Sequence, residues 1–352
     1  MDDVIIRVAA MVFCTFLFVL TIIPLVKKMA EHVGALDLPN ARKVHKKPMP
    51  RLGGLGIFLG FLFGYILFGK PSALMNSVLI GSFVIIITGI MDDIKPLDAK
   101  IKFMGQIAAA AIVVLYGNLV MYELSAFGIV IQFGIFSKLI SMFFILGCIN
   151  CINLIDGLDG LAAGISSIYF LTIGIIALMQ GKLGLDCLLT FIMLGSTLGF
   201  LVHNFNPASI FMGDTGSMFL GFIIAVIALL GFKNVTMTSL VIPVMILAIP
   251  ILDTLFAIIR RLLKGESISK PDKFHIHHQL LSRNFTQKQT VLLIYLMNIL
   301  FAIASIVYIT KDRQLGYIIY SILFAIIVFF VANTNIIYEH KGRLKRLLRI
   351  KK

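Results

Sequence analysis

The chain has 352 residues, of which 59% are hydrophobic and only 14% are charged, and its mean hydropathy is +1.00. Soluble domains are about 45–50% apolar and about 25% charged, so these values exclude a soluble globular enzyme, a disordered chain and a secreted disulfide-rich scaffold. In a soluble protein the net charge of +14 would suggest nucleic acid. In a membrane protein basic residues mainly report orientation, and we expect no nucleic-acid partner.

Apolar segments of the length needed to cross a bilayer recur along the whole chain and predict an all-α polytopic membrane protein. The eleven predicted spans are 4–26, 53–69, 74–91, 101–116, 136–154, 161–179, 186–202, 215–231, 237–259, 290–309 and 315–337. Of the 31 Lys and Arg residues, 24 fall on one side of these spans and 7 on the other. Because cytoplasmic loops are enriched in basic residues, the N-terminus is predicted outside and the C-terminus in the cytoplasm.

Between the fourth and fifth spans, alternating apolar residues at 129, 131 and 133 around Gly128 predict a short external β-hairpin. The ninth span contains Pro243 and Pro250, which predict a kink. Cys148 and Cys151 form a C-x-x-C within an apolar span and are interpreted as packing residues. The chain shows no linker or repeat, so residues 1–352 are predicted to form a single domain.

Carboxylates gather at the predicted cytoplasmic ends of three spans. Asp92 and Asp93 end the third, Asp156 and Asp159 end the fifth, and Asp214 opens the eighth. Ionisable groups at membrane depth usually mark a functional site, and the dipole at a helix C-terminus disfavours anions. Such a cluster needs a countercharge, and Mg²⁺ takes carboxylate oxygens together with substrate phosphates. The pattern predicts a site for a phosphorylated substrate at the inner membrane face.

Five segments resemble the polyprenyl-phosphate N-acetylhexosamine-1-phosphate transferases. They are DLPNARKVHKKPMPRLGG (37–54), MDDIKPLDAKIKFMGQ (91–106), NCINLIDGLDGLAAG (150–164), HNFNPASIFMGDTGSMFLG (203–221) and PDKFHIHHQLL (271–281). The His-Ile-His-His run and the early RKVH are similar to the GlcNAc branch, in particular to the type that initiates teichoic acid synthesis. The resemblance implies an enzyme of the plasma membrane that uses UDP-GlcNAc and undecaprenyl phosphate, gives undecaprenyl-diphospho-GlcNAc and UMP, and requires Mg²⁺, with Mn²⁺ as an alternative. It also leads us to expect a homodimer.

The resemblance also implies a role for each matching residue. Asp214 and Asn153 would hold the metal on the donor diphosphate. Asp92 and Asp93 would be catalytic, with Asp92 deprotonating or orienting the attacking phosphate oxygen, although a covalent Asp intermediate stays open. The residues expected to bind substrate are Lys102, Asp156, Asp159, Asn204, Phe211, His275, His277 and His278.

Within that set, Lys102 would bind phosphate, Asp159 and Asn204 would reach the uridine, and Phe211 would stack on uracil. The His motif would contact the sugar phosphate. Several residues also have a purely structural alternative: an N-cap for Asp214, an interhelical hydrogen bond for Asn153, a membrane anchor for Lys102, and a core or lipid-facing position for Phe211. His45 and Arg51 are weaker candidates, because basic residues are expected in that loop anyway. Asp253, inside the ninth span, is expected to pair with Arg260 or Arg261 on the same helix.

Three other functions remain open. A phospho-MurNAc-pentapeptide transferase would differ only in its donor. An intramembrane aspartic protease is suggested by Asp214-Thr215-Gly216, but such an enzyme needs two carboxylates that share a proton, and the chain has one D-T-G. A transporter would place acids near the bilayer midplane and show paired repeats, whereas the acids here gather at one edge.

Overall fold

The computed structural model describes residues 2–39, 47–126, 129–181, 184–233, 241–263, 265, 274–310 and 313–332. The chain divides into two compact units, residues 1–244 and 245–352. Each unit is described by itself. The prediction of a single domain therefore stays a prediction.

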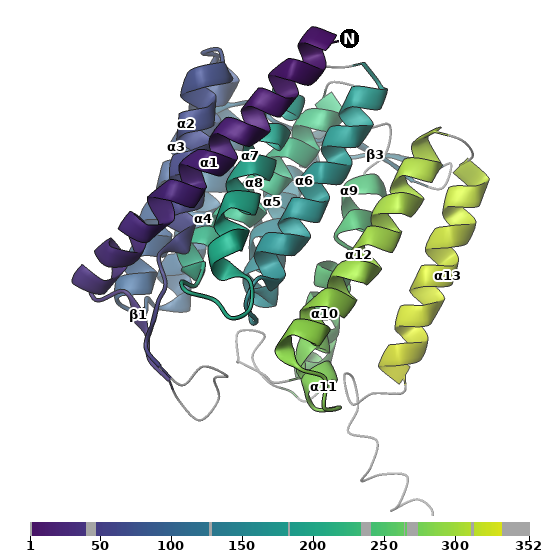
Figure 1. Cartoon of the computed structure of the whole chain (residues 1–352). Coiled ribbons are helices and arrows are strands. Elements are labelled where there is room, and N and C mark those ends of the chain that lie inside the picture. The colour runs from purple at the N-terminus through teal and green to yellow at the C-terminus, as the bar shows by residue number, and fades with distance from the viewer. Residues whose placement is uncertain are drawn as a thin grey trace, which may run out of the picture. The chain divides into compact units, whose positions relative to one another are not determined.

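The first unit is a helical bundle with two short strand pairs (Figure 1). Its elements are α1 (Asp2–His32), β1 (Leu36–Asp37), β2 (Met49–Pro50), α2 (Gly53–Phe68), α3 (Ala73–Ile94), α4 (Ala99–Ala111), the π-helical turn η1 (Ile112–Tyr116), β3 (Glu123–Ala126), β4 (Ile129–Gln132), the 3-10 turn η2 (Gly134–Phe136), α5 (Ser137–Ile155), α6 (Leu161–Met179), α7 (Leu185–Asn204), α8 (Gly213–Lys233) and the start of α9 (Val241–Ile246). The second unit contains the end of α9, α10 (Ala248–Leu263), α11 (Ile276–Leu281), α12 (Gln287–Thr310) and α13 (Arg313–Ala332).

Helix α8 is the centre of the first unit and packs against α2, α3, α5, α6 and α7. Its sequence is apolar on all sides, which is typical of a helix that is buried all round, and the side chains from Met218 to Ala228 that form its apolar core are 0% exposed. Helix α1 lies outside, against α2 and α7. Its outward residues are large and apolar, such as Ile6 and Phe13, which are 66% and 62% exposed. Such a surface suits contact with lipid chains.

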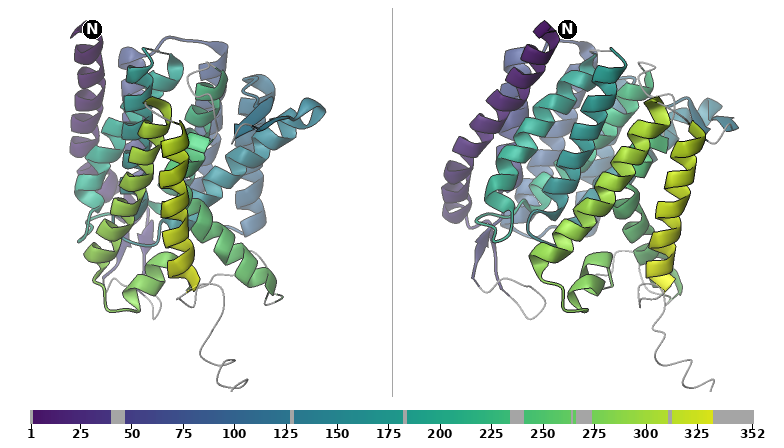
Figure 2. Two further views of the ribbon diagram at one scale, coloured as in Figure 1. Left: turned by 90° about the vertical axis from the view of Figure 1, so that its right-hand side faces the viewer. Right: turned by 45° about the vertical axis from the view of Figure 1, so that its right-hand side comes forward.

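The two strand pairs mark different levels of the first unit. The ribbon of β1 and β2 lies at its lower end in Figure 1, whereas β3 and β4 lie in its upper half (Figures 1 and 2). Strands β3 and β4 are antiparallel, in register from Glu123 opposite Gln132 to Ala126 opposite Ile129. The predicted hairpin is therefore confirmed, although Gly128 lies outside the described residues. Helix α1 starts at the upper end and finishes near the β1–β2 ribbon (Figure 1).

Within the described residues, nine helices are long and apolar enough to cross a membrane. They confirm an all-α polytopic membrane protein, and ten of the eleven predicted spans correspond to helices when the shorter α2 is included. The exception is the predicted span 237–259. Its described part is divided at Leu247 into α9 and α10. Pro250 has no N–H to donate to the carbonyl of residue 246, which explains why the chain interrupts its helix there instead of only bending.

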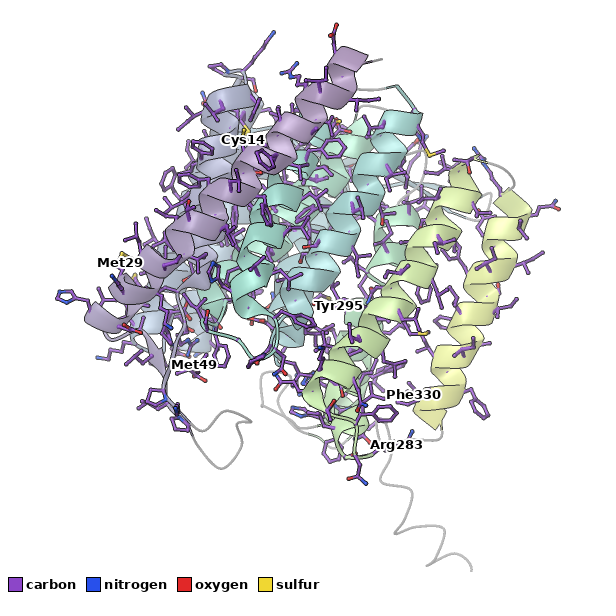
Figure 3. All side chains as sticks on the ribbon, in the orientation of Figure 1. Cys14, Met29, Met49, Arg283, Tyr295 and Phe330 are labelled. Atoms are coloured by element: carbon purple, nitrogen blue, oxygen red, sulfur yellow. The ribbon has the colours of Figure 1, made fainter. Side chains whose placement is uncertain are left out.

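In the second unit α12 and α13 form an antiparallel pair (Figure 1) that is joined by contacts between aromatic rings. The hydroxyls of Tyr308 and Tyr317 lie 3.1 Å apart, and Tyr320 donates a hydrogen bond of 2.8 Å to the hydroxyl of Ser305. Near the other end of the pair, the guanidinium carbon of Arg283 lies 5.2 Å from the ring centroid of Phe330 (Figure 3). These polar contacts fix the register of two otherwise apolar helices.

Candidate active site

Three carboxylates converge where α3 ends and α8 begins. One side-chain oxygen each from Asp92, Asp93 and Asp214 lies within 4.8 Å of the others. Asp92 and Asp93 are buried, at 6% and 3% exposure. The two helices pack side by side and run in opposite directions through this contact, so the last turn of α3 meets the first turn of α8. The structure thus brings Asp214 beside Asp92 and Asp93, which lie more than a hundred residues earlier in the chain.

Asp93 ties the start of α8 to α3. Its carboxylate accepts hydrogen bonds from the backbone N–H of Asp214 at 2.9 Å, from that of Thr215 at 3.0 Å, and from the Thr215 hydroxyl at 2.6 Å. The first N–H groups of a helix lack partners within the helix and carry partial positive charge. Asp93 therefore serves as the N-terminal cap of α8 from a neighbouring helix, and its contacts anchor the segment that carries Asp214.

Gly213 makes this close approach possible. Its φ is +73°, a backbone conformation that residues other than glycine rarely adopt. A Cβ at this position would lie 2.3 Å from an Asp93 carboxylate oxygen and 2.3 Å from the backbone oxygen of Arg51. The glycine in the sequence FMGD is thus required by the packing around Asp93.

Arg51 and Lys102 supply the positive charge of the cluster. Arg51 donates from Nε to Asp93 at 2.9 Å, and another of its nitrogens lies 3.6 Å from Asp214. Burial alone would lower the pKa of Arg51, but the carboxylates of Asp93, Asp214 and Asp37 outweigh it and raise the pKa above its ordinary value. Lys102 bridges Asp92, at 3.2 Å, and Asp214. The two cations hold the acids together.

Arg51 has a larger part in the cluster than its position in a basic loop indicates. It follows β2 directly, and the backbone of Phe211 pairs with this stretch, donating to the oxygen of Pro50 at 2.7 Å and accepting from the N–H of Gly53 at 2.9 Å. The first loop and the FMGD segment are therefore fastened side by side. The available signal was the position of a basic residue immediately before a glycine-rich helix start. His45, the other weak candidate, lies outside the described residues.

Asn153 reaches α8 from α5. Its amide nitrogen donates a hydrogen bond of 2.8 Å to the hydroxyl of Ser217. Ser217 lies three residues after Asp214, and residues three apart in a helix are neighbours on its surface. Asn153 therefore makes the interhelical hydrogen bond that was its structural alternative. This bond holds the amide about one helical turn from Asp214. Its role as a metal ligand stays a prediction.

Asp159 and Asn204 fasten two loops to each other. One oxygen of Asp159 accepts from the side chain of Asn206 at 2.9 Å and from the backbone of Ala208 at 3.1 Å. The Asn204 amide accepts from the backbone of Gly160 at 3.0 Å and donates to the oxygen of Ile210 at 2.9 Å. These bonds join the turn after α5 to the turn after α7, and they give both residues a structural role that the sequence did not suggest.

Asp156 and Phe211 lie in the same two loops. Asp156 follows the last residue of α5, and burial raises the pKa of its carboxyl to about 8, with further upward contributions from Asp214 and Asp93. Phe211 is half-buried. Their predicted substrate roles, like those of Asp159 and Asn204, stay predictions.

The His motif belongs to the second unit. His275 contacts Asp253 of α10, with 2.9 Å between Nδ1 and Oδ2. The rings of His275 and His277 are stacked with centroids 5.7 Å apart, and those of His277 and His278 are 4.3 Å apart. The sequence favours an arginine partner for Asp253 on its own helix, whereas the structure shows a histidine 22 residues away in contact with it. That the His motif shares a site with the carboxylates stays a prediction.

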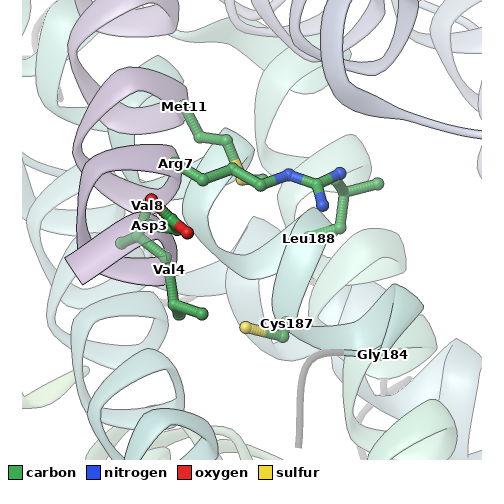
Figure 4. Close-up of a pocket in the computed structure, with 8 residues that line it drawn as sticks. All are labelled: Asp3, Val4, Arg7, Val8, Met11, Gly184, Cys187 and Leu188. Carbon is green, nitrogen blue, oxygen red and sulfur yellow. The ribbon is translucent and has the colours of Figure 1, made fainter. Parts of the chain in front are cut away.

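A separate pocket lies at the other end of the first unit (Figure 4). It has a volume of about 210 Å³ and is lined by Asp3, Val4, Arg7, Val8, Met11, Gly184, Cys187 and Leu188. These residues belong to the starts of α1 and α7, whereas α7 ends at Asn204 beside the loops described above. None of the predicted site residues lines this pocket. The start of α1 and the carboxylate cluster therefore lie at opposite ends of the first unit, and which end faces the cytoplasm stays a prediction.

The fold and the site together define a polytopic helical membrane protein with a carboxylate–lysine–arginine cluster at one end of its bundle. Residues 75–232 match the model of glycosyl transferase family 4, and this range includes the three clustered acids, Lys102 and Asn153. The chain belongs to this family, which confirms the resemblance seen in the sequence.

Three relatives illustrate the membership. The chain is 43% identical over 342 residues, 96% of its length and 95% of the relative's, to a probable undecaprenyl-phosphate N-acetylglucosaminyl 1-phosphate transferase of Bacillus subtilis. It is 33% identical to the decaprenyl-phosphate N-acetylglucosaminephosphotransferase of Mycobacterium tuberculosis, over 77% of this chain and 75% of the relative. It is 31% identical to the undecaprenyl-phosphate alpha-N-acetylglucosaminyl 1-phosphate transferase of Escherichia coli K12, over 82% and 80%.

Proposed function

We propose that this protein transfers GlcNAc-1-phosphate from UDP-GlcNAc to undecaprenyl phosphate, giving undecaprenyl-diphospho-GlcNAc and UMP. The convergence of Asp92, Asp93 and Asp214 around Lys102 and Arg51 at one end of a membrane bundle is the observation that carries the proposal. The names of the relatives support the same donor fragment and a polyprenyl phosphate acceptor.

The location follows from the chemistry of the two substrates. The acceptor is confined to the bilayer and the donor is water-soluble, so the reaction needs a site at a membrane face. The excess of basic residues in the loops on the side of the carboxylate cluster favours the cytoplasmic face of the plasma membrane. The positively charged loops also attract an anionic donor.

In the proposed reaction an oxygen of undecaprenyl phosphate forms a bond to the phosphorus that carries GlcNAc. The bond from that phosphorus to the bridging oxygen breaks, and UMP leaves. Both reactants are anions, so positioning and charge neutralisation supply most of the catalysis, as in phosphoryl transfer generally. Lys102 and Arg51 are the fixed cations of the cluster, and we assign Lys102 to the transferred phosphates.

Asp92 is proposed to orient or deprotonate the attacking phosphate oxygen. One of its oxygens accepts from the backbone N–H of Leu97 at 2.9 Å and the other faces Lys102 at 3.2 Å. It is therefore held less rigidly than Asp93, which accepts from two backbone N–H groups, a hydroxyl and Arg51. Because the second pKa of a phosphate monoester is about 6, a strong base is not needed.

Asp214 and Asn153 are proposed to hold Mg²⁺. The clustered carboxylates offer only oxygen donors within 4.8 Å of one another, which fits a hard divalent cation; Mn²⁺ accepts the same ligands. When bound, the metal neutralises charge on the donor diphosphate. Asp156, Asp159, Asn204 and Phe211 are proposed to bind the uridine end of the donor, and the three histidines its sugar phosphate.

A transfer assay tests this function. Full-length protein in detergent is incubated with Mg²⁺, undecaprenyl phosphate and radiolabelled UDP-GlcNAc, and lipid-extractable label and UMP are measured. We expect equal amounts of both products, loss of activity with EDTA and recovery with Mg²⁺ or Mn²⁺. Label that appears only with UDP-MurNAc-pentapeptide would change the donor, and no label with either donor would refute the proposal.

The product is proposed to begin a cell-wall glycopolymer of the teichoic acid type, on the strength of the resemblance in the first loop and the His motif. We also expect a homodimer. Analytical ultracentrifugation of the detergent-solubilised protein tests the second expectation. Depletion of the protein in cells, followed by analysis of wall phosphate, tests the first.

A further inference from the structure

Asp253 is a buried acid whose place in the function has not yet been explained. It lies within α10, a helix that is otherwise apolar until its basic last turn, and is 4% exposed. A carboxylate at such a position is costly unless it has partners, and it usually marks function. The sequence predicted only an ion pair with Arg260 or Arg261 on the same helix.

The two oxygens of Asp253 hold two different parts of the His motif. Oδ2 lies 2.9 Å from Nδ1 of His275, and Oδ1 accepts the backbone N–H of Ile276 at 2.8 Å. His275 is the residue immediately before α11, and its side chain is 7% exposed. One carboxylate thus fixes both the ring of His275 and the backbone that starts α11.

This geometry determines which nitrogen of His275 carries hydrogen. An ionised carboxylate only accepts hydrogen bonds, so the hydrogen resides on Nδ1. The bond at Nδ1 then sets the direction of Nε2, and Nε2 can donate to an anion when it carries a hydrogen as well. A carboxylate that orients a histidine in this way is a common second partner in metal and catalytic sites.

We propose that Asp253 is a positioning residue for His275, fixing its ring orientation so that Nε2, carrying a hydrogen as Nδ1 does, donates to a phosphate oxygen of the nucleotide-sugar donor. This inference rests on the proposed function, in which the His motif contacts the sugar phosphate. Asp253 itself does not touch substrate. Its contribution is to remove the rotational freedom that His275 would otherwise lose on binding.

The first test is Asp253→Asn. The two N–H groups are met by different oxygens of Asp253, and an amide replaces one of those oxygens with an NH₂ group, so one of the two contacts is lost. We expect kcat/KM for UDP-GlcNAc to fall about 10- to 100-fold, the range seen when such orienting carboxylates are removed. KM for undecaprenyl phosphate should not change. Asp186→Asn is the matched control, because Asp186 is 2% exposed but begins α7, at the end away from the carboxylate cluster.

A double-mutant cycle separates positioning from a merely structural role. If Asp253 acts through His275, then Asp253→Asn has no further effect on kcat/KM in a His275→Ala background. Long incubation with radiolabelled donor keeps slow turnover measurable. If Asp253→Asn does not yield folded protein, Asp253→Glu takes its place in the same cycle.

Two results would overturn the inference. One is an Asp253 variant that has the same kcat/KM as an active wild-type protein. The other is an Asp253 substitution that lowers kcat/KM by the same factor in the wild-type background and in the His275→Ala background. A wild-type protein that transfers no label would overturn the proposed function, and this inference with it.

Discussion

The substitution Asp93→Asn distinguishes an anchoring carboxylate from one that only serves chemistry. Asp93 has a side chain that is 0% exposed, pairs with Arg51, and accepts three hydrogen bonds from the start of α8. An amide in its place presents one N–H₂ group to donors and leaves Arg51 without this counterion. Removing one partner of a buried ion pair typically costs about 3–5 kcal/mol.

The lower end of that range applies here, because Arg51 keeps Asp37 and Asp214, each at 3.6 Å. A loss of about 3 kcal/mol corresponds to a fall in apparent Tm on the order of 10 °C. The assay is thermal unfolding of the metal-free protein in detergent, followed by a thiol-reactive dye or by loss of monodisperse protein. Asp186→Asn is again the control for a buried acid changed to an amide.

Two companion variants sharpen the result. Thr215→Val removes only the 2.6 Å hydroxyl bond to Asp93 and should cost about 1–2 kcal/mol. Asp92→Asn should destabilise less than Asp93→Asn, because among the described residues the Asp92 carboxylate accepts from Leu97 and Lys102 alone. It should still abolish transfer. An Asp93→Asn protein with a Tm within about 2 °C of the wild type would refute the anchoring role.

Three further predictions concern the rest of the cluster. Lys102→Gln leaves Asp92 and Asp214 without the cation between them, so initial rates of label transfer should fall at least about 100-fold while the protein stays folded. Gly213→Ala should lower both Tm and activity, because the φ of +73° costs about 1–2 kcal/mol for alanine and the Cβ would lie 2.3 Å from Asp93. Gly34→Ala is the control for the conformational cost alone, because Gly34 has a φ of +76° and a Cβ there would meet nothing within 4 Å. Asp156 has its pKa raised to about 8 by burial, against about 4 when unfolded. The carboxyl therefore binds its proton more tightly in the folded protein than in the unfolded chain. The contribution of this difference to the free energy of unfolding is fully present below pH 4 and is lost as the pH rises through 8. In EDTA, the Tm of Asp156→Asn minus the Tm of the wild type should therefore increase from pH 5 to pH 8.

Each of these predictions has a clear contrary result. Wild-type rates in Lys102→Gln would remove that lysine from the phosphate site. Equal Tm losses for the two glycine variants would show that the packing against Asp93 is loose. A Tm difference for Asp156→Asn that does not change with pH would show that this carboxyl titrates normally in the folded protein.

Much of the architecture could be predicted from the sequence because bilayer spans are a local property. About twenty consecutive apolar residues identify a helix regardless of what it contacts, and the alternation around 129–133 was sufficient for the hairpin. The failure at 237–259 has a local cause of a different kind. Pro250 permits either a kink or an interruption, and hydropathy does not distinguish between them.

The sequence by itself determined the membrane class, the side on which basic loops gather, and the set of acids at helix ends. Those features depend only on composition and on residues near one another in the chain. The tertiary structure decided what each polar side chain does: Asp93 caps a helix that begins 120 residues later, Asn204 ties two turns together, and Asp253 orients His275. A hydrogen bond joins atoms within about 3 Å, and no pattern along the chain shows which distant backbone groups will come that close when helices pack.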